Sequence, residues 1–257
     1  MTRAVSPAIG SCELAFAARR RIDPHRAARQ HAAYEDALRS AGCAIERLAP
    51  ADQHPDGVFV EDTAVVLDEI AVIARPGAES RRGETETTAG ALSAYRTLAE
   101  IRAPGTLDGG DVLVSGKDLF VGRSRRTDGE GIRQLEAVLA PFGYRVFALE
   151  FGRCLHLKTA ATLIGERQIL FDPDRIDGDA FPGHETVPVA PGEGEAANAV
   201  CVNGRVMLSA SGLRTGERLA ARGIEPIMIA NDELAKAEGG LSCCSLLLEL
   251  RTPTEHG

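Results

Sequence analysis

The hydrophobic pattern consists mainly of short apolar runs that come in pairs. Four segments each place a polar residue ahead of two such runs, which a two-residue turn joins. This arrangement is typical of a β-hairpin. The segments cover residues 62–73, 108–121, 156–171 and 198–208, and a fifth apolar run follows Cys243. Because the segments begin 42 to 48 residues apart, the chain is predicted to contain five related units.

Apolar residues at helical spacing fill the stretches between the predicted hairpins. Asp23 before Pro24 is a helix start signal, and Gly42 is a stop signal. Thr127 and Glu130 form a candidate capping box ahead of another apolar pattern. Each unit is therefore predicted to be a hairpin followed by a helix, which makes the chain an α/β protein. The predicted helices follow Asp23, span residues 84–99, follow Thr127 and span residues 215–222.

Units of this kind bury their hydrophobic faces only against their neighbours, so five of them are expected to close into a ring. The fifth unit lacks a second strand, and the stretch near residues 3–5 is expected to supply it. We predict a single domain over residues 1–257. In such a ring the polar residue that leads each unit points into one central channel. The leading residues are Asp62, Asp108, His156, Asn198 and Cys243.

Charge and composition narrow the possible partners. The formal net charge is −8, Trp is absent, and no dense run of Lys and Arg extends beyond residues 19–21. A nucleic-acid-binding surface needs a basic stripe, so nucleic acid is not expected as a partner. No apolar stretch has the length of a membrane span or a signal-peptide core, and the six cysteines lack C-x-x-C spacing. We expect a cytoplasmic protein with reduced thiols and no membrane partner.

Two of the leading residues suggest covalent chemistry. Cys243 and Cys244 are adjacent, and alternation along a strand sends only one of them into the channel. They are either two buried structural thiols or include a nucleophile, which needs a cationic neighbour because only about 3% of an ordinary thiol is ionised at pH 7. His156 lies between two leucines at the predicted start of a strand. It is either a core residue or a general acid and base that Asp108 orients.

Acidic and basic residues near the predicted strand ends suggest the charge of a ligand. Three acids precede or begin the first hairpin, namely Asp56, Glu61 and Asp62. Their side chains are either solvated or line the channel. In a channel they require a cation, and a planar guanidinium pairs well with carboxylates. Two arginine-bearing loops, residues 75–84 and 123–127, follow the second strands of the first two hairpins. Their arginines are either exposed or hold the carboxylate of an amino acid.

Six motifs, found in order from about residue 14 to residue 250, resemble the dimethylarginine dimethylaminohydrolase family. They are Asp56-x-Val58-Phe59-Val60-Glu61-Asp62, Arg75-Pro-Gly-Ala-Glu-Ser-Arg81-Arg82-Gly-Glu, Leu107-Asp108-Gly-Gly-Asp111-Val, Arg126-Thr127, Leu155-His156-Leu-Lys-Thr159 and Leu241-Ser-Cys243-Cys244-Ser245. The resemblance implies the pentein fold, a five-bladed pseudo-symmetric α/β propeller, which agrees with the predicted ring. It also implies hydrolysis of asymmetric dimethylarginine and monomethylarginine to citrulline, with release of dimethylamine or methylamine.

The resemblance implies a role for each matching residue. The nucleophile corresponds to Cys243, the general acid and base to His156, and the carboxylate that orients this histidine to Asp108. Substrate-binding positions correspond to Leu14, Asp56, Glu61, Asp62, Arg81, Arg126 and Ala237. Among these, the acids recognise the guanidinium, mainly through Asp62, the arginines hold the amino-acid end, and Leu14 belongs to a mobile lid. This chain departs from the family at Glu238, where relatives often have Asp.

By this resemblance the substrate is a small methylated arginine, and the reaction passes through a thiouronium intermediate on the cysteine. No metal or organic cofactor is expected. Alternatives are an arginine deiminase, an amidinotransferase that uses an amine in place of water, and a non-catalytic propeller that binds a cation. A zinc site of Cys243, Cys244 and His156 is disfavoured because adjacent cysteines on a strand point in opposite directions. The oligomeric state is left open.

Overall fold

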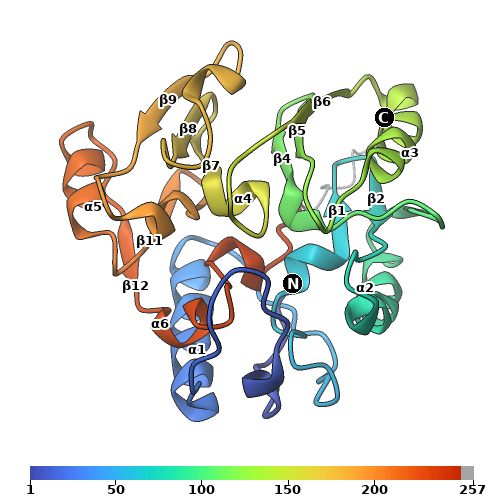
Figure 1. Cartoon of the computed structure of the whole chain (residues 1–257), viewed down its shortest axis with the longest axis horizontal. Helices are drawn as coiled ribbons and strands as arrows, with labels where there is room; N and C mark the ends of the chain where they lie inside the picture. Colours follow the sequence, from blue (N-terminus) through green and yellow to red (C-terminus); the bar gives the residue numbers. More distant parts are fainter. Residues whose placement is uncertain (250–257) are drawn as a thin grey trace, which may run out of the picture.

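Every predicted hairpin is present, and each one gains a third strand. The computed structural model describes residues 1–249, and in this part of the chain the strands form four separate three-stranded sheets (Figure 1). In each sheet the first two strands are antiparallel, whereas the third returns parallel to the second. The sheets are β1 (Ala64–Val66), β2 (Ile70–Ile73) and β3 (Thr97–Glu100); β4 (Val112–Ser115), β5 (Asp118–Gly122) and β6 (Arg145–Leu149); β7 (Ala161–Gly165), β8 (Gln168–Phe171) and β9 (Glu185–Pro188); and β10 (Val200–Val202), β11 (Arg205–Ser209) and β12 (Ile227–Ile229).

The hydrophobic pattern does not predict the third strands. β3 and β6 lie at the outer edge of their sheets and are partly exposed, so they lack the buried apolar residues that mark the hairpin strands. The helix predicted over residues 84–99 is therefore wrong in its second half. The helix α2 (Thr85–Leu92) ends at Leu92, and residues 97–99 belong to β3. A parallel return needs a crossover connection, and the helix supplies it.

The longer helices begin where a carboxylate accepts free backbone N–H groups. Asp23 caps the first helix by accepting two of these groups, as the sequence predicts. The capping box predicted at Thr127 is wrong, because Asp128 is the residue that caps the next long helix. None of the helices in residues 1–249 is long and apolar enough to span a membrane. Besides α2, the α-helices are α1 (Pro24–Ser40), α3 (Gly129–Leu139), α4 (Leu157–Ala160), α5 (Leu213–Ala220) and α6 (Asp232–Ala235).

A single helical turn precedes each predicted hairpin and the final apolar run. The 3-10 helices are η1 (Ile9–Ser11), η2 (Val60–Thr63), η3 (Glu79–Glu84), η4 (Gly109–Asp111), η5 (Ala140–Phe142), η6 (Gly178–Ala180), η7 (Gly194–Ala197) and η8 (Ser242–Cys244). His156 directly precedes α4 and Cys243 lies in η8, so neither stands on a strand as predicted. The turn η2 packs against η4 and η8, and α4 packs against η4 and η7. The leading residues are therefore brought together between the sheets (Figure 1).

The hydrophobic core is divided among the units. In the described part of the chain, buried apolar side chains form five clusters. Three of them lie between consecutive sheets, from the β1–β3 sheet to the β10–β12 sheet. A fourth joins the β10–β12 sheet to α1 and η8, and the fifth joins the β1–β3 sheet to Met1, Leu48 and Leu246. This division is expected for units that pack only against their neighbours.

The start of the chain pairs with two distant segments. The amino group of Met1 donates to the carbonyl of Leu246 at 2.6 Å, and the Leu246 N–H donates back to the Met1 carbonyl at 2.9 Å. Thr2 forms a parallel bridge with Arg47. This pairing lies at residues 1 and 2, whereas the sequence places it near residues 3–5.

Candidate active site

Most of the residues predicted to form the site meet around one small cavity, which we call the front pocket. Its volume is about 10 Å³, so side chains nearly fill it. Asp108 lies behind His156, Leu14 follows Glu13, which lines the pocket, and neither Leu14 nor Glu61 lines it. Seven of the ten predicted residues line the pocket, namely Asp56, Asp62, Arg81, Arg126, His156, Ala237 and Cys243.

The imidazole of His156 lies between two carboxylates. Its Nε2 is 3.0 Å from an oxygen of Asp108, and its Nδ1 is 3.6 Å from an oxygen of Asp62. All three side chains are buried. Burial lowers the pKa of this histidine, but these two carboxylates together with that of Asp111 outweigh the effect and raise the pKa to about 9. At neutral pH the imidazole therefore carries a proton on each nitrogen and can act as a proton donor.

The same three side chains also have the composition of a metal site. Their ligand atoms all lie within 4.8 Å of one another. Because each nitrogen of His156 faces a carboxylate, an ion bound among them must displace a proton that the two acids stabilise. The arrangement is therefore better suited to holding and moving a proton than to holding a metal ion.

Asp108 is fixed through its backbone as well as its side chain. Its N–H donates to the hydroxyl of Thr127 at 3.1 Å, and its carboxylate faces His156. The glycines that follow allow close approach of the chain to other groups. A Cβ on Gly110 would lie 2.6 Å from Asp62 Oδ1 and 2.8 Å from the Nδ1 of the histidine. The Asp-Gly-Gly sequence therefore brings three catalytic-type side chains together and does not serve a turn alone.

Arg81 pairs with the acid predicted to bind the guanidinium. Its Nη1 is 2.6 Å from Asp62 Oδ2. Its Nη2 is 2.8 Å from the carboxylate of Glu84 and donates a hydrogen bond to the carbonyl of Phe59 at 3.1 Å. Burial tends to raise the pKa of Asp62, but His156 and Arg81 lower it to about 2. Asp62 is therefore ionised at neutral pH, and Arg81 is already held by two carboxylates.

Arg126 differs from Arg81 in having an unsatisfied donor. It is buried, and its Nη1 lies 3.5 Å from Asp108 Oδ2. This Nη1 has no hydrogen-bond partner among residues 1–249. A buried N–H without a partner is costly, so the position favours an anion supplied from outside the chain. The predicted role of holding an amino-acid carboxylate fits Arg126 better than Arg81.

Cys243 lines the front pocket, whereas Cys244 does not. The thiol of Cys244 donates to the carbonyl of Gly240 at 3.6 Å, within a buried apolar cluster. The two side chains thus have different surroundings, although a helical turn and not strand alternation separates them. Burial raises the pKa of the Cys243 thiol well above its usual value, and Glu61 and Asp62 raise it further. A cation in the pocket is needed to favour the thiolate.

Residues 13–17 lie beside the front pocket, which Glu13 lines, and two carboxylates anchor this segment. Glu238 accepts three successive backbone N–H groups, those of residues 15–17, at 2.6 to 2.7 Å. Asp56 accepts the first N–H of the segment at 3.0 Å. Leu14, the predicted lid residue, lies between these anchors. Glu238 has a φ of 58°, a left-handed conformation that is uncommon for a residue with a side chain.

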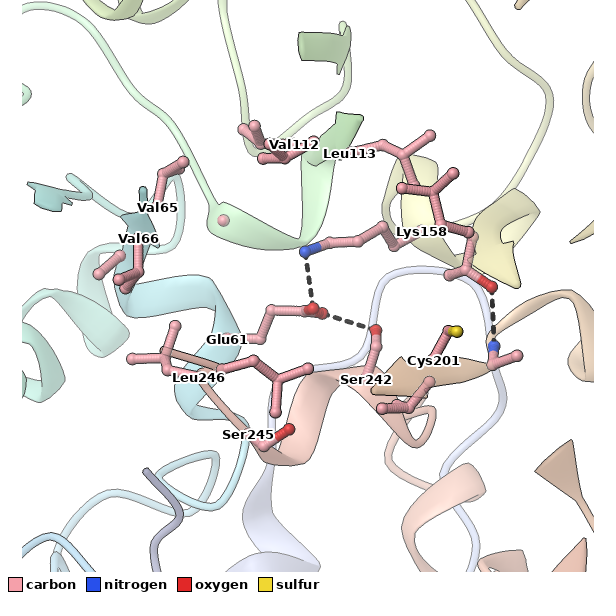
Figure 2. A pocket seen from close by; sticks show the side chains of 18 residues that line it. Glu61, Val65, Val66, Val112, Leu113, Lys158, Cys201, Ser242, Ser245 and Leu246 are labelled. Atoms are coloured by element: carbon pink, nitrogen blue, oxygen red, sulfur yellow. Dashed lines mark hydrogen bonds and ion pairs between the residues drawn. The ribbon is translucent and has the colours of Figure 1, made fainter. Parts of the chain in front are cut away.

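Glu61 points into a second cavity of about 280 Å³, which we call the rear cavity (Figure 2). Its carboxylate binds the ammonium of Lys158 at 2.6 Å and accepts the hydroxyl of Ser242 at 2.8 Å. Apolar side chains, including Val112 and Leu246, surround this group. The structure therefore separates Glu61 from the other acids that the resemblance groups with it.

Some residues of the site carry no clear signal in the sequence. Lys158 follows His156 by two positions, but only the fold places it against Glu61. Glu84 stands three residues after Arg81, which is a recognisable ion-pair spacing in a helix. The clamp formed by Glu238 has no local signal, because its partners lie more than 200 residues away along the chain.

Comparison with known proteins gives close relatives, although no family model matches the chain. The chain is 38% identical over 251 residues to N(G),N(G)-dimethylarginine dimethylaminohydrolase from Streptomyces coelicolor, and the match covers 96% of each chain. It is 36% identical over 226 residues to the protein of the same name from Pseudomonas aeruginosa, with 87% of this chain and 89% of that one covered.

The solved structures agree with these relatives. A cysteine-to-serine mutant of DDAH from Pseudomonas aeruginosa, complexed with citrulline, matches with a TM-score of 0.88. It is 32% identical to this chain, and the match covers 95% of this chain and 96% of that one. Together with the four mixed sheets, this likeness shows an α/β fold of the pentein type.

Proposed function

Because this chain belongs to the dimethylarginine dimethylaminohydrolase family, we propose that it hydrolyses asymmetric dimethylarginine and monomethylarginine to citrulline. The observation that carries the proposal is the front pocket, where a cysteine, a protonated histidine and an ionised carboxylate meet. A thiol can attack carbon, an imidazolium can protonate a leaving amine, and a carboxylate can bind a cation. These are the three tasks that cleavage of a guanidinium C–N bond requires.

The two charged ends of the substrate are bound by Asp62 and Arg126 in this proposal. Asp62 is ionised, and each carboxylate oxygen can accept more than one hydrogen bond, so a guanidinium can bind beside Arg81. The unsatisfied Nη1 of Arg126 donates to the carboxylate of the amino acid. Arg81 acts mainly by holding Asp62 in place. The residues that enclose the substrate are Leu14, Asp56 and Ala237.

Cys243 is the proposed nucleophile. The substrate guanidinium lies next to the thiol and lowers its pKa, so it supplies the cation that the thiolate needs, and the thiol proton passes to solvent. The sulfur forms a bond to the central guanidinium carbon, and the bond from this carbon to the methylated nitrogen breaks. His156 donates a proton to that nitrogen, so the amine leaves as a neutral molecule. A thiouronium on Cys243 remains.

Water completes the reaction in a second step. His156, now neutral, takes a proton from a water molecule. At the same time the oxygen of this water forms a bond to the thiouronium carbon. The carbon–sulfur bond then breaks, and the remaining hydroxyl proton passes to the sulfur, which leaves citrulline and a free thiol. Citrulline has no guanidinium charge, so it loses its attraction to Asp62 and dissociates. Side chains, substrate and water supply every proton and bond, and the proposal includes no metal or organic cofactor.

We also propose that the chain forms one domain with five blades closed by its first residues. The paired bonds between Met1 and Leu246 are those of an antiparallel pair, and the bridge from Thr2 to Arg47 is parallel. This order repeats the antiparallel and then parallel pairing of the four sheets. The five core clusters support the same interpretation, because each joins two neighbouring units and the fifth joins the last to the first.

Citrulline formation tests the function directly. The purified protein is incubated with asymmetric dimethylarginine, monomethylarginine or arginine, without added metal. We expect turnover of the methylated substrates and not of arginine. Preferred turnover of arginine contradicts the proposal in favour of a deiminase, and citrulline from none of the three contradicts hydrolysis altogether. The cytoplasmic location stays a prediction, which fractionation of the source cells tests.

A further inference from the structure

Adjacent residues of two central turns face different cavities. On η2, Asp62 lines the front pocket and Glu61 lines the rear cavity. On η8, Cys243 lines the front pocket and Ser242 lines the rear cavity. Glu61 accepts the Ser242 hydroxyl at 2.8 Å, and Lys158 binds the same carboxylate at 2.6 Å (Figure 2). We call Glu61, Lys158 and Ser242 the floor triad, since they bind one another and all line the rear cavity.

The turn that carries Cys243 is held on both sides of this residue. The side chain of Asn198 accepts the Ser242 N–H at 2.9 Å and lies 3.0 Å from the Ser242 hydroxyl. After the cysteine, the hydroxyl of Ser245 lies 2.7 Å from that of Tyr34. Together with Glu61, these contacts fix the backbone around the nucleophile through neighbouring residues. Such support is what a reactive side chain needs for a defined orientation.

We propose that Glu61 is a positioning residue for Cys243 and not a substrate-binding acid. Its carboxylate holds the Ser242 hydroxyl, and thereby the turn that carries the nucleophile, while Lys158 balances its charge. This inference rests on the proposed function of Cys243 as the nucleophile. Both partners of Glu61 come from the chain itself, so its carboxylate is satisfied without a ligand.

The two charges of the floor triad have opposite effects on the thiol. Burial raises the pKa of Cys243 most, and the charge of Glu61 raises it further. Burial also raises the pKa of Glu61, and the charge of Lys158 counteracts part of this rise by favouring the ionised acid. The other titratable side chains around the thiol are Glu13, Tyr34, Asp56, Asp62, Arg81, Arg126, His156, Glu238 and Cys244.

Alkylation of Cys243 by iodoacetamide measures these opposite effects. The rate is followed by mass spectrometry of the Cys243 peptide from about pH 6 to about pH 10. In Glu61→Gln the amide oxygen still accepts the Ser242 hydroxyl but has no charge, so alkylation at a given pH is expected to be about tenfold faster. In Lys158→Met the acid loses its counter-charge, so alkylation above about pH 8 is expected to be several-fold slower.

A second ion pair provides the matched control. Glu69 and Lys117 are also 2.6 Å apart but line neither the front pocket nor the rear cavity. Glu69→Gln and Lys117→Met are expected to leave the alkylation profile unchanged. Equal profiles in all four variants, or shifts of the same sign in both floor-triad variants, overturn the proposal.

Steady-state kinetics separate positioning from substrate binding. Glu61→Ala and Ser242→Ala both remove the bond between the turns, so each is expected to lower kcat about 10- to 100-fold with KM within about threefold. Glu61→Gln keeps the bond and is expected to recover most of the kcat that Glu61→Ala loses. If Glu61 instead binds the guanidinium, Glu61→Gln raises KM strongly and Ser242→Ala leaves it unchanged.

The outcomes of these two experiments can be told apart from a failure of the proposed function. Alkylation requires no methylarginine, so the opposite shifts can be read even if the wild-type protein forms no citrulline. Absence of citrulline therefore contradicts the proposed function alone. An active wild-type protein whose Ser242→Ala and Glu61→Ala variants keep full kcat contradicts the positioning role alone.

Discussion

The front pocket and the rear cavity lie on either side of the same two turns, but their charges are satisfied differently. In the rear cavity, Glu61, Lys158 and Ser242 satisfy one another and leave an open volume of about 280 Å³. In the front pocket, Arg126 has a buried donor without a partner among residues 1–249, and the volume is about 10 Å³. Because this donor lies on the wall of a pocket, it favours binding of an anion there, whereas the satisfied groups of the rear cavity fit a structural role.

The two consecutive acids of η2 show this difference within one peptide. Burial raises the pKa of Glu61, which has one cationic partner in Lys158. Asp62 is equally buried, but Arg81 and the protonated His156 hold its pKa at about 2. The surrounding charges therefore shift the pKa values of the two acids in opposite directions, and the acid with the lowered pKa is the one that lines the front pocket.

The largest effect should come from the two cysteines of η8, because only one of them lines the front pocket. Cys243→Ser is expected to lower citrulline formation by at least about 10⁴-fold, since a serine hydroxyl is not ionised near neutral pH. Calorimetry should still detect binding of dimethylarginine to this variant.

Cys244→Ser is the matched control for the nucleophile. Its thiol contacts Gly240 and not the pocket, so activity is expected to stay within about threefold of wild type. Similar losses in both variants would mean that the two cysteines do not differ in the way their surroundings indicate.

A smaller effect, on stability, should come from the two carboxylates that face His156. Its pKa in the folded state, about 9, lies above the ordinary 6.5, so the resulting stabilisation is fully present below about pH 6.5 and is lost as the pH rises through 9. The shift corresponds to at most on the order of 3 kcal/mol. Denaturant unfolding of wild type and His156→Asn should show a difference in the free energy of unfolding that shrinks as the pH rises. A difference that grows would contradict the raised pKa.

The smallest effect should come from residues 13–17, the segment that Glu238 anchors beside the front pocket. In Glu238→Gln one of the two accepting oxygens becomes an NH2 group, so at least one of the three backbone hydrogen bonds is lost and the rest lose the strengthening charge, and KM is expected to rise about 3- to 10-fold. Amide hydrogen exchange at residues 15–17 should become faster, whereas exchange in β10, which borders the rear cavity, should not change. Unchanged exchange at residues 15–17 would show that Glu238 does not anchor the segment.

The fold could be predicted where apolar residues are buried and regularly spaced. The four hairpins follow from paired apolar runs, and α1 follows from Asp23 and Pro24. The third strands could not be predicted in the same way. Strand β3, for example, is short and partly exposed, so the residue propensities favour an extension of the preceding helix. The turns that hold His156 and Cys243 could not be predicted from the sequence either, because a single helical turn has no periodicity to detect.

The site could be predicted as a set of residues but not as a set of contacts. The motifs by themselves determined which chemistry is available, because the identity of a cysteine, a histidine or an acid and its spacing along the chain are local properties. Only the tertiary structure decided that Asp62 faces the front pocket and Glu61 the rear cavity, and that Arg81 is paired while Arg126 keeps an unsatisfied donor. Burial and charge pairing arise between units far apart in sequence, so no local pattern records them.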